Sequence, residues 1–138
     1  MKVFVDTNII ISSILFPNGK VSKVFSHILE NHAVIISSYS KQECIEVFKK
    51  KFPHKIEQIQ IFFSGINYEE FVTPTDFNKN DYPEIRDIKD LPILVSAILS
   101  NADILLTGDK DFEEIKIKKP IIYSPTKYLE LIESAEEL

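Results

Sequence analysis

The sequence has very few of the residues that several common kinds of site require. Its 138 residues contain one cysteine, three glycines and no tryptophan. The single cysteine, Cys44, excludes an internal disulfide. The first residues also lack the pattern of a signal peptide, so we expect a reducing, cytoplasmic environment. With only three glycines, the chain has no G-x-G-x-x-G and no Walker motif, which argues against a glycine-rich phosphate loop.

Long apolar runs and an excess of positive charge are missing as well. No run approaches the ~18 apolar residues that would span a membrane, so we expect no membrane association. The 16 basic and 21 acidic residues give a formal charge of −5, which argues against a protein that coats nucleic acid non-specifically. An enzyme that cuts nucleic acid is not excluded, because carboxylates that hold metal ions lower the net charge.

The residues that are present suit one soluble domain over 1–138, since 44% are hydrophobic and 27% are charged. Short apolar runs alternate with amphipathic segments. This alternation predicts an α/β fold whose parallel sheet has helices on both faces. A polar stretch over 73–89 is typical of a surface loop. We expect strands at 3–5, 33–36, 68–72, 103–107 and 120–123, and helices at 8–15, 20–31, from after Ser38 to about 52, about 54–65, 91–102, 109–115 and after Ser124.

Acidic residues stand where the expected strands end. Asp6 closes the first strand, and Asp109 and Asp111 follow the fourth. Glu43 lies in the first or second turn of the helix after the second strand, and Asp90 lies near the start of the helix after the long loop. Because strand ends that lead into helices share one edge of a parallel sheet, we expect these carboxylates to meet at one rim.

A cluster of this kind either shares protons or holds cations. Oxygen ligands without histidine or cysteine favour Mg²⁺ or Mn²⁺ over zinc, and such ions assist phosphodiester hydrolysis. Each acid taken alone has a structural explanation: Asp6 and Asp109 suit helix caps, and Asp90 suits the positive end of a helix. We interpret Asp87 as a loop or cap residue rather than a ligand.

The second acid is open to two assignments. Glu43 and Glu46 both lie off the apolar face of their helix, so the periodicity does not choose between them. Glu43 is closer to the start of the helix and hence to the sheet edge, which favours it.

Two stretches of the sequence that contain these acids resemble the end motifs of the PIN domain family. They are Val-Asp-Thr-Asn-Ile at 5–9 and Leu-Thr-Gly-Asp-Lys-Asp-Phe at 106–112. Between them, 38–47 resembles the segment that carries the family's glutamate, and 87–97 resembles the segment that carries its third acid. Over nearly its whole length the chain is most similar to small prokaryotic PIN proteins that serve as toxins in toxin–antitoxin systems.

The resemblance implies a Rossmann-like three-layer α/β/α sandwich and a ribonuclease that depends on Mg²⁺ or Mn²⁺. It also implies an RNA substrate, an antitoxin partner and a homodimer. When the family's functional residues are carried over onto the matching positions, the catalytic acids are Asp6, Glu43, Asp90 and Asp109. The metal ligands are Asp6, Asp90 and Asp109 with Asp111 as an outer ligand, and the supporting polar residues are Thr7, Asn8 and Thr107.

Two other functions are compatible with parts of the pattern. A catalytically silent interaction module would keep the fold and use the acids only to bind a partner. A phosphotransferase would use Asp6 as its nucleophile, but Asn8 stands where such enzymes have a second aspartate. Two lysine groups either guide RNA or form solvated surface. They are Lys49, Lys50, Lys51 and Lys55, and Lys110, Lys116, Lys118 and Lys119.

Overall fold

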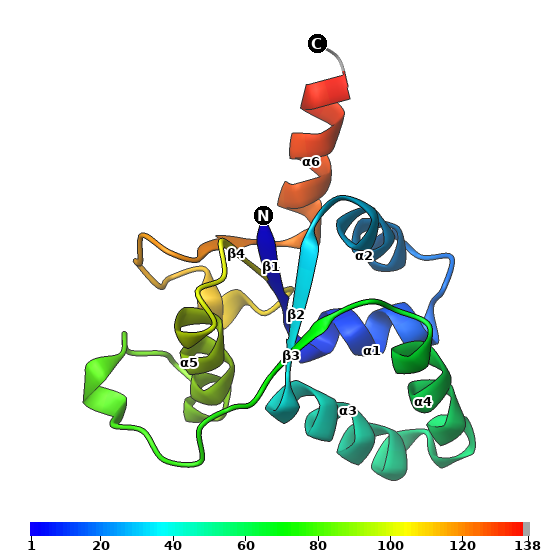
Figure 1. Cartoon of the computed structure of the whole chain (residues 1–138), viewed down its shortest axis with the longest axis horizontal. Helices are drawn as coiled ribbons and strands as arrows, with labels where there is room; N and C mark the ends of the chain where they lie inside the picture. The colour runs from blue at the N-terminus through cyan, green and yellow to red at the C-terminus, as the bar shows by residue number, and fades with distance from the viewer. Residues whose placement is uncertain (137–138) are drawn as a thin grey trace.

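The computed structural model describes residues 1–136 and has a five-stranded sheet in the order β3-β2-β1-β4-β5 (Figure 1). Every neighbouring pair of strands is parallel, so the α/β prediction is confirmed. The central strand β1 is hydrogen-bonded on both sides, to β2 and β4. The strands are β1 (Lys2–Val5), β2 (Ala33–Ser37), β3 (Glu69–Phe71), β4 (Ile104–Leu106) and β5 (Ile121–Tyr123).

Within residues 1–136, six α-helices connect and follow these strands. They are α1 (Thr7–Leu15), α2 (Lys20–Asn31), α3 (Ser38–Lys51), α4 (Ile56–Ser64), α5 (Leu91–Leu99) and α6 (Pro125–Glu136). Four single turns of 3₁₀ helix lie between them: η1 (Pro53–Lys55), η2 (Lys79–Asp81), η3 (Ile88–Asp90) and η4 (Lys110–Phe112). None of the helices described in residues 1–136 is long and apolar enough to cross a membrane.

The prediction of a helix over 109–115 is wrong beyond its first turn. The chain forms only η4 and then runs without regular structure to β5. Ile115 and Ile117 both pack against the core under α5, and their spacing of two residues suits an extended chain rather than a helix. The packing of these two side chains therefore overrides the helical pattern.

The two faces of the sheet bury different residues of the same strands. In β1, Val3 and Val5 point to one face and Phe4 to the other, and all three are fully buried. Helices α1, α2, α3, α4 and α6 contribute to the first core, whereas α5 and Phe112 form the second with residues from the irregular segments. Figure 1 shows this division, with α5 on one side of the strands and α1 to α4 on the other.

Phenylalanines from three helices pack in the first core. Phe25 and Phe48 are buried, and Phe52, Phe62 and Phe63 lie half-buried against the same cluster. Stacking of Phe25 on Phe62, with ring centroids 5.7 Å apart, joins α2 to α4. Packing thus accounts for these aromatic side chains without a binding role.

Candidate active site

Asp6 lies at the carboxyl end of the central strand and is almost entirely buried, with 4% of its surface exposed. Both of its carboxylate oxygens accept hydrogen bonds. The Thr7 amide donates to Oδ1 at 2.6 Å, and the Thr107 hydroxyl donates to Oδ2 at 2.6 Å. Asp6 therefore caps α1, as its residue type suggested, and its position is fixed by a contact from Thr107, which directly follows β4.

The register of the sheet explains why Thr107 meets Asp6. Val5 in β1 pairs with Leu106 in β4, so the residues that follow these two lie side by side. The Asp6 amide donates to the Leu106 carbonyl at 3.0 Å, which extends the ladder by one bond. The Thr107 hydroxyl also accepts the Asp109 amide at 3.0 Å. Thr107 thus connects the two acids that end the neighbouring strands.

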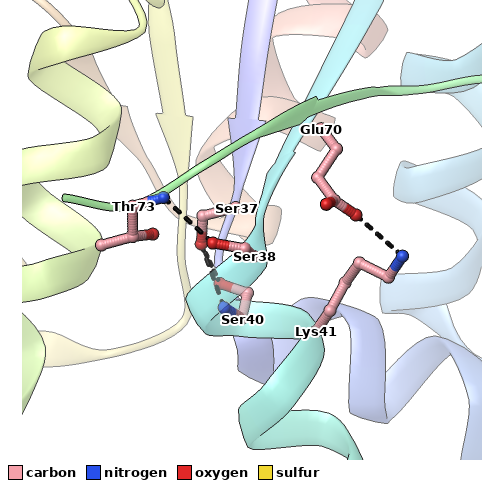
Figure 2. Close-up of polar contacts among 6 residues, drawn as sticks. All are labelled: Ser37, Ser38, Ser40, Lys41, Glu70 and Thr73. Atoms are coloured by element: carbon pink, nitrogen blue, oxygen red, sulfur yellow. Dashed lines mark hydrogen bonds and ion pairs between the residues drawn. The ribbon is translucent and has the colours of Figure 1, made fainter. Parts of the chain in front are cut away.

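Glu43 reaches the same place from α3. Ser37 caps this helix, because its hydroxyl accepts the Ser40 amide at 3.0 Å (Figure 2). One turn further on, Glu43 Oε1 accepts the Thr7 hydroxyl at 2.7 Å. Glu46 is exposed, and within residues 1–136 its side chain accepts only from Gln42, at 3.4 Å. The structure therefore places Glu43, and not Glu46, beside Asp6.

Polar contacts around the end of β2 hold the start of α3 and the segment that leaves β3 (Figure 2). The Thr73 amide donates to the Ser38 hydroxyl at 3.0 Å, and the Thr73 hydroxyl lies 2.9 Å from that of Ser96 in α5. Lys41 and Glu70 form an ion pair at 2.8 Å. These contacts anchor the beginning of the long segment that leads to Asp90.

Asp87, Asp90 and Asp111 form a second part of the cluster. Each offers one carboxylate oxygen, and these oxygens lie within 4.8 Å of one another. Asp87 caps η3 by accepting the Lys89 amide at 3.0 Å, as expected, but it also belongs to this group. Sequence reasoning missed that proximity. The available signal was its spacing from Asp90, because residues i and i+3 lie on the same side of a 3₁₀ turn.

The pKa values of the central acids are raised. Burial raises the pKa of Asp6 from 3.8 to about 6, and the charges of Glu43 and Asp109 add to this rise, while the hydrogen bonds from Thr107 and Thr7 oppose it. Burial also raises the pKa of Asp90 to about 7, together with the charge of Asp109 and a hydrogen bond to it. The pKa of Glu43 is raised chiefly by burial. These carboxylates lack enough positive charge around them to remain ionised at low cost.

The donor set fits a hard divalent cation. Every candidate ligand is a carboxylate oxygen, and acids on four segments converge on one edge of the sheet. Within residues 1–136, the only ion pair at the cluster joins Arg86 to Asp111 at 3.8 Å, and the Arg86 side chain is 84% exposed. A bound Mg²⁺ or Mn²⁺ would offset both the burial and the mutual repulsion that raise these pKa values.

The other residues named from the sequence lie around this cluster or away from it. Asn8 is exposed in the first turn of α1, and among the described residues its side chain makes no hydrogen bond. Lys49, Lys50 and Lys51 are exposed at the end of α3. Lys119 is engaged with Asp103 and Asn101, at 3.4 Å and 3.0 Å. These four lysines thus lie on the surface, and Lys119 has structural partners.

Comparisons with known proteins agree with this fold. The family model of the PIN domain matches residues 2–111. No curated protein matches the chain. Among solved structures, the chain is similar to VapBC2 from Rickettsia felis bound to a DNA fragment from their promoter, with a TM-score of 0.66 and 23% identity over 90% of this chain and 98% of that one. It is also similar to VapBC-1 from nontypeable Haemophilus influenzae, with a TM-score of 0.61 and 22% identity over 92% and 100%.

Proposed function

The chain belongs to the PIN domain family, and from this premise we propose that it is an endoribonuclease that depends on Mg²⁺ or Mn²⁺. One observation supports the proposal most strongly. Thr7 and Thr107 connect Glu43, Asp6 and Asp109 by hydrogen bonds across three separate segments of the chain. A scaffold without catalysis has no need for acids that are buried, held in place and raised in pKa.

Asp6, Asp90 and Asp109 are the residues that would hold the cation, with Asp111 as an outer ligand and Asp87 close by. When bound, the ion supplies a Lewis acid for the phosphodiester and a water of lowered pKa for in-line attack. Thr107 and Thr7 keep the Asp6 carboxylate oriented through both of its oxygens. Because the pKa of Asp90 is raised to about 7, chiefly by burial, a bound cation would favour the ionised form of this carboxyl and release its proton.

We further propose that the protein is the toxin of a toxin–antitoxin pair. Its sequence resembles small PIN toxins, and both similar structures named above are VapBC proteins. An antitoxin that covers the carboxylate edge would keep the nuclease inactive, and a homodimer is expected by the same analogy. Co-expression with the protein encoded by the neighbouring gene tests the partner: a stable complex with suppressed cleavage is expected, and unchanged cleavage would contradict it.

The nuclease proposal is tested by cleavage of labelled single-stranded RNA in Mn²⁺, Mg²⁺ or EDTA. Asp109→Asn removes the charge of a cluster acid and nearly preserves its shape. Asp76→Asn is the matched control, because Asp76 is exposed and lies outside the cluster. We expect the wild type and the control to cleave only with metal, and Asp109→Asn to be at least 100-fold slower. Equal cleavage by all three proteins would contradict the proposal.

A further inference from the structure

A cavity of about 350 Å³ opens directly beside the carboxylate cluster. Its wall includes Thr107 and Asp109, which also belong to the cluster, so the cavity adjoins the cluster. The rest of the wall comes from the irregular segment after η4, from β5 and from the first turn of α6. In Figure 1 this is the orange part of the chain, which leaves the sheet after β4 and returns to it as β5.

The cavity wall combines an apolar surface with a polar edge. Four isoleucines form the apolar part: Ile115, Ile117, Ile121 and Ile122. Ser124 and Lys127 line the polar edge from the start of α6, and Asp109 and Glu113 line it from the segment around η4. The Ser124 hydroxyl accepts the Lys127 amide at 3.1 Å, and within residues 1–136 it donates to no protein atom. This edge therefore offers a hydroxyl donor and an ammonium group, and the ammonium group also forms an exposed ion pair with Glu130 at 4.0 Å.

The volume lies at the lower end of the range of small-ligand pockets, about 300–1,000 Å³. It suits one flat ring system with its sugar, and it is too small for a folded segment of a partner protein. A nucleoside presents an apolar ring face, hydrogen-bonding ring edges and a phosphate. The ring face matches the isoleucines, the ring edges match the Ser124 hydroxyl, and the phosphate matches the Lys127 ammonium group. Sequence-selective proteins commonly bind single-stranded RNA through unstacked bases of this kind.

We propose that this isoleucine cavity binds one unstacked nucleoside of the RNA substrate, next to the phosphate that is cleaved. The base lies against the isoleucines, and the adjoining phosphate lies near Lys127. The proposal rests on the proposed ribonuclease function and adds to it a place where the enzyme selects its cleavage position. It also favours single-stranded regions as substrates, because a base in a duplex cannot enter the cavity.

The first test fills the cavity. Ile121 is 50% exposed on the edge strand β5, so Ile121→Trp adds bulk at the cavity with little loss of packing. The matched control is Ile61→Trp, because Ile61 is 70% exposed on α4 and lies outside the cavity. The substrates are an oligonucleotide whose cleavage position has been mapped and the same strand with an abasic ribose beside that position. Melting temperature and Mn²⁺ calorimetry show that both variants are folded and loaded.

We expect Ile121→Trp to raise KM for the intact strand at least tenfold, while Ile61→Trp leaves it unchanged. The abasic strand should be cleaved poorly by the wild type and no worse by Ile121→Trp, because both changes remove the same contact. If Ile121→Trp cleaves the intact strand with the same KM as the control, the cavity is not a base site. The same conclusion follows if this variant raises KM equally for the intact and the abasic strands. If the wild type binds Mn²⁺ but cleaves no RNA, so that no cleavage position can be mapped, the proposed function itself is wrong.

A second variant tests the phosphate contact without adding bulk. Binding of the oligonucleotide is measured by fluorescence anisotropy without divalent ions, over a series of salt concentrations. Lys127→Met should reduce the slope of log K against log salt by about 0.7, the value for one phosphate on a single strand. Lys2→Met is the control, since Lys2 lies at the opposite end of β1 from Asp6. Equal slopes for the two variants would contradict a phosphate contact by Lys127.

Discussion

At the scale of single residues, keeping the buried acids of the cluster ionised costs free energy, and their hydrogen bonds offset this cost only in part. Asp6 is buried, and its pKa of about 6 lies well above its ordinary value of 3.8. Between these values the folded protein binds more protons than the unfolded chain, so stability falls as the pH rises. The pKa values of Glu43 and Asp90 are raised as well and act in the same direction.

This cost predicts the pH dependence of the metal-free protein. We expect its free energy of unfolding to fall as the pH rises from about 4 to about 7. Asp6→Asn removes the charge and keeps the shape, so it should flatten this fall and stabilise the metal-free protein at pH 8 by about 1–3 kcal/mol. Urea unfolding at several pH values measures both effects. The exposed control Asp76→Asn should change neither, and an Asp6→Asn protein that is less stable than the wild type at pH 8 would contradict the account.

Part of the candidate site, residue by residue, could be predicted from the sequence. The acids at strand ends follow from the rule that these ends share an edge, and the structure does bring Asp6, Glu43 and Asp109 together. The nearness of Asp87 to Asp90 and Asp111 was missed, because it depends on the conformation of a loop turn. Loop turns leave no periodic pattern in a sequence. Likewise, only the sheet register places Thr107 opposite Asp6.

At the scale of elements, the structure holds the acids by connecting segments that are distant in the sequence. The Tyr39 hydroxyl in α3 donates to the Lys89 carbonyl in η3 at 3.1 Å, and so links the helix of Glu43 to the turn of Asp90. The first half of α3 and the end of the long segment are therefore fixed relative to each other. Their mutual position determines whether Glu43 and Asp90 face the same ion.

We expect Tyr39→Phe to weaken metal binding more than it weakens the fold. The variant removes one hydrogen bond, worth about 0.5–1.5 kcal/mol, and keeps the ring. Calorimetry should show a severalfold higher Kd for Mn²⁺, with a melting temperature close to that of the wild type. Tyr82→Phe is a suitable control, since Tyr82 lies in the long segment and packs on Phe77. A Kd that matches the control would show that this link does not position Asp90.

Element boundaries were predictable to different degrees. Buried strands such as β1 and β4 gave clear apolar runs, whereas β3 is an exposed edge strand of only three residues and gave a weak one. The expected helix after Asp109 is one 3₁₀ turn, because the following isoleucines pack across the second face of the sheet instead. That choice depends on tertiary packing, which a local pattern does not contain. The same isoleucines line the cavity beside the site.

At the scale of the whole molecule, the sheet separates two cores that are covered unequally. Five helices contribute to one core, while the other depends on α5 and on irregular chain. Phe4 points into this second core from the middle of the central strand and is fully buried. The strand order that creates this arrangement could not be derived from the sequence, because alternating strands and helices are compatible with several orders.

Phe4→Ala should therefore destabilise the whole domain. Removal of a buried phenylalanine side chain costs about 3–5 kcal/mol. Phe16→Ala is the matched control, since Phe16 is 63% exposed, and it should change stability by about 0.5 kcal/mol or less. Chemical denaturation measures both variants. If Phe4→Ala costs no more than the control, the second core contributes less than its burial implies.

The central claim is that carboxylates from separate segments form one metal site that cleaves RNA. The most direct measurement is a calorimetric titration of the wild type and Asp6→Ala with Mn²⁺, followed by incubation of both with labelled single-stranded RNA. We predict that the wild type binds Mn²⁺ and cleaves, and that Asp6→Ala stays folded but does neither. A wild type that does not bind Mn²⁺, or undiminished cleavage by a well-purified Asp6→Ala protein, would contradict the claim and leave the acids as helix caps.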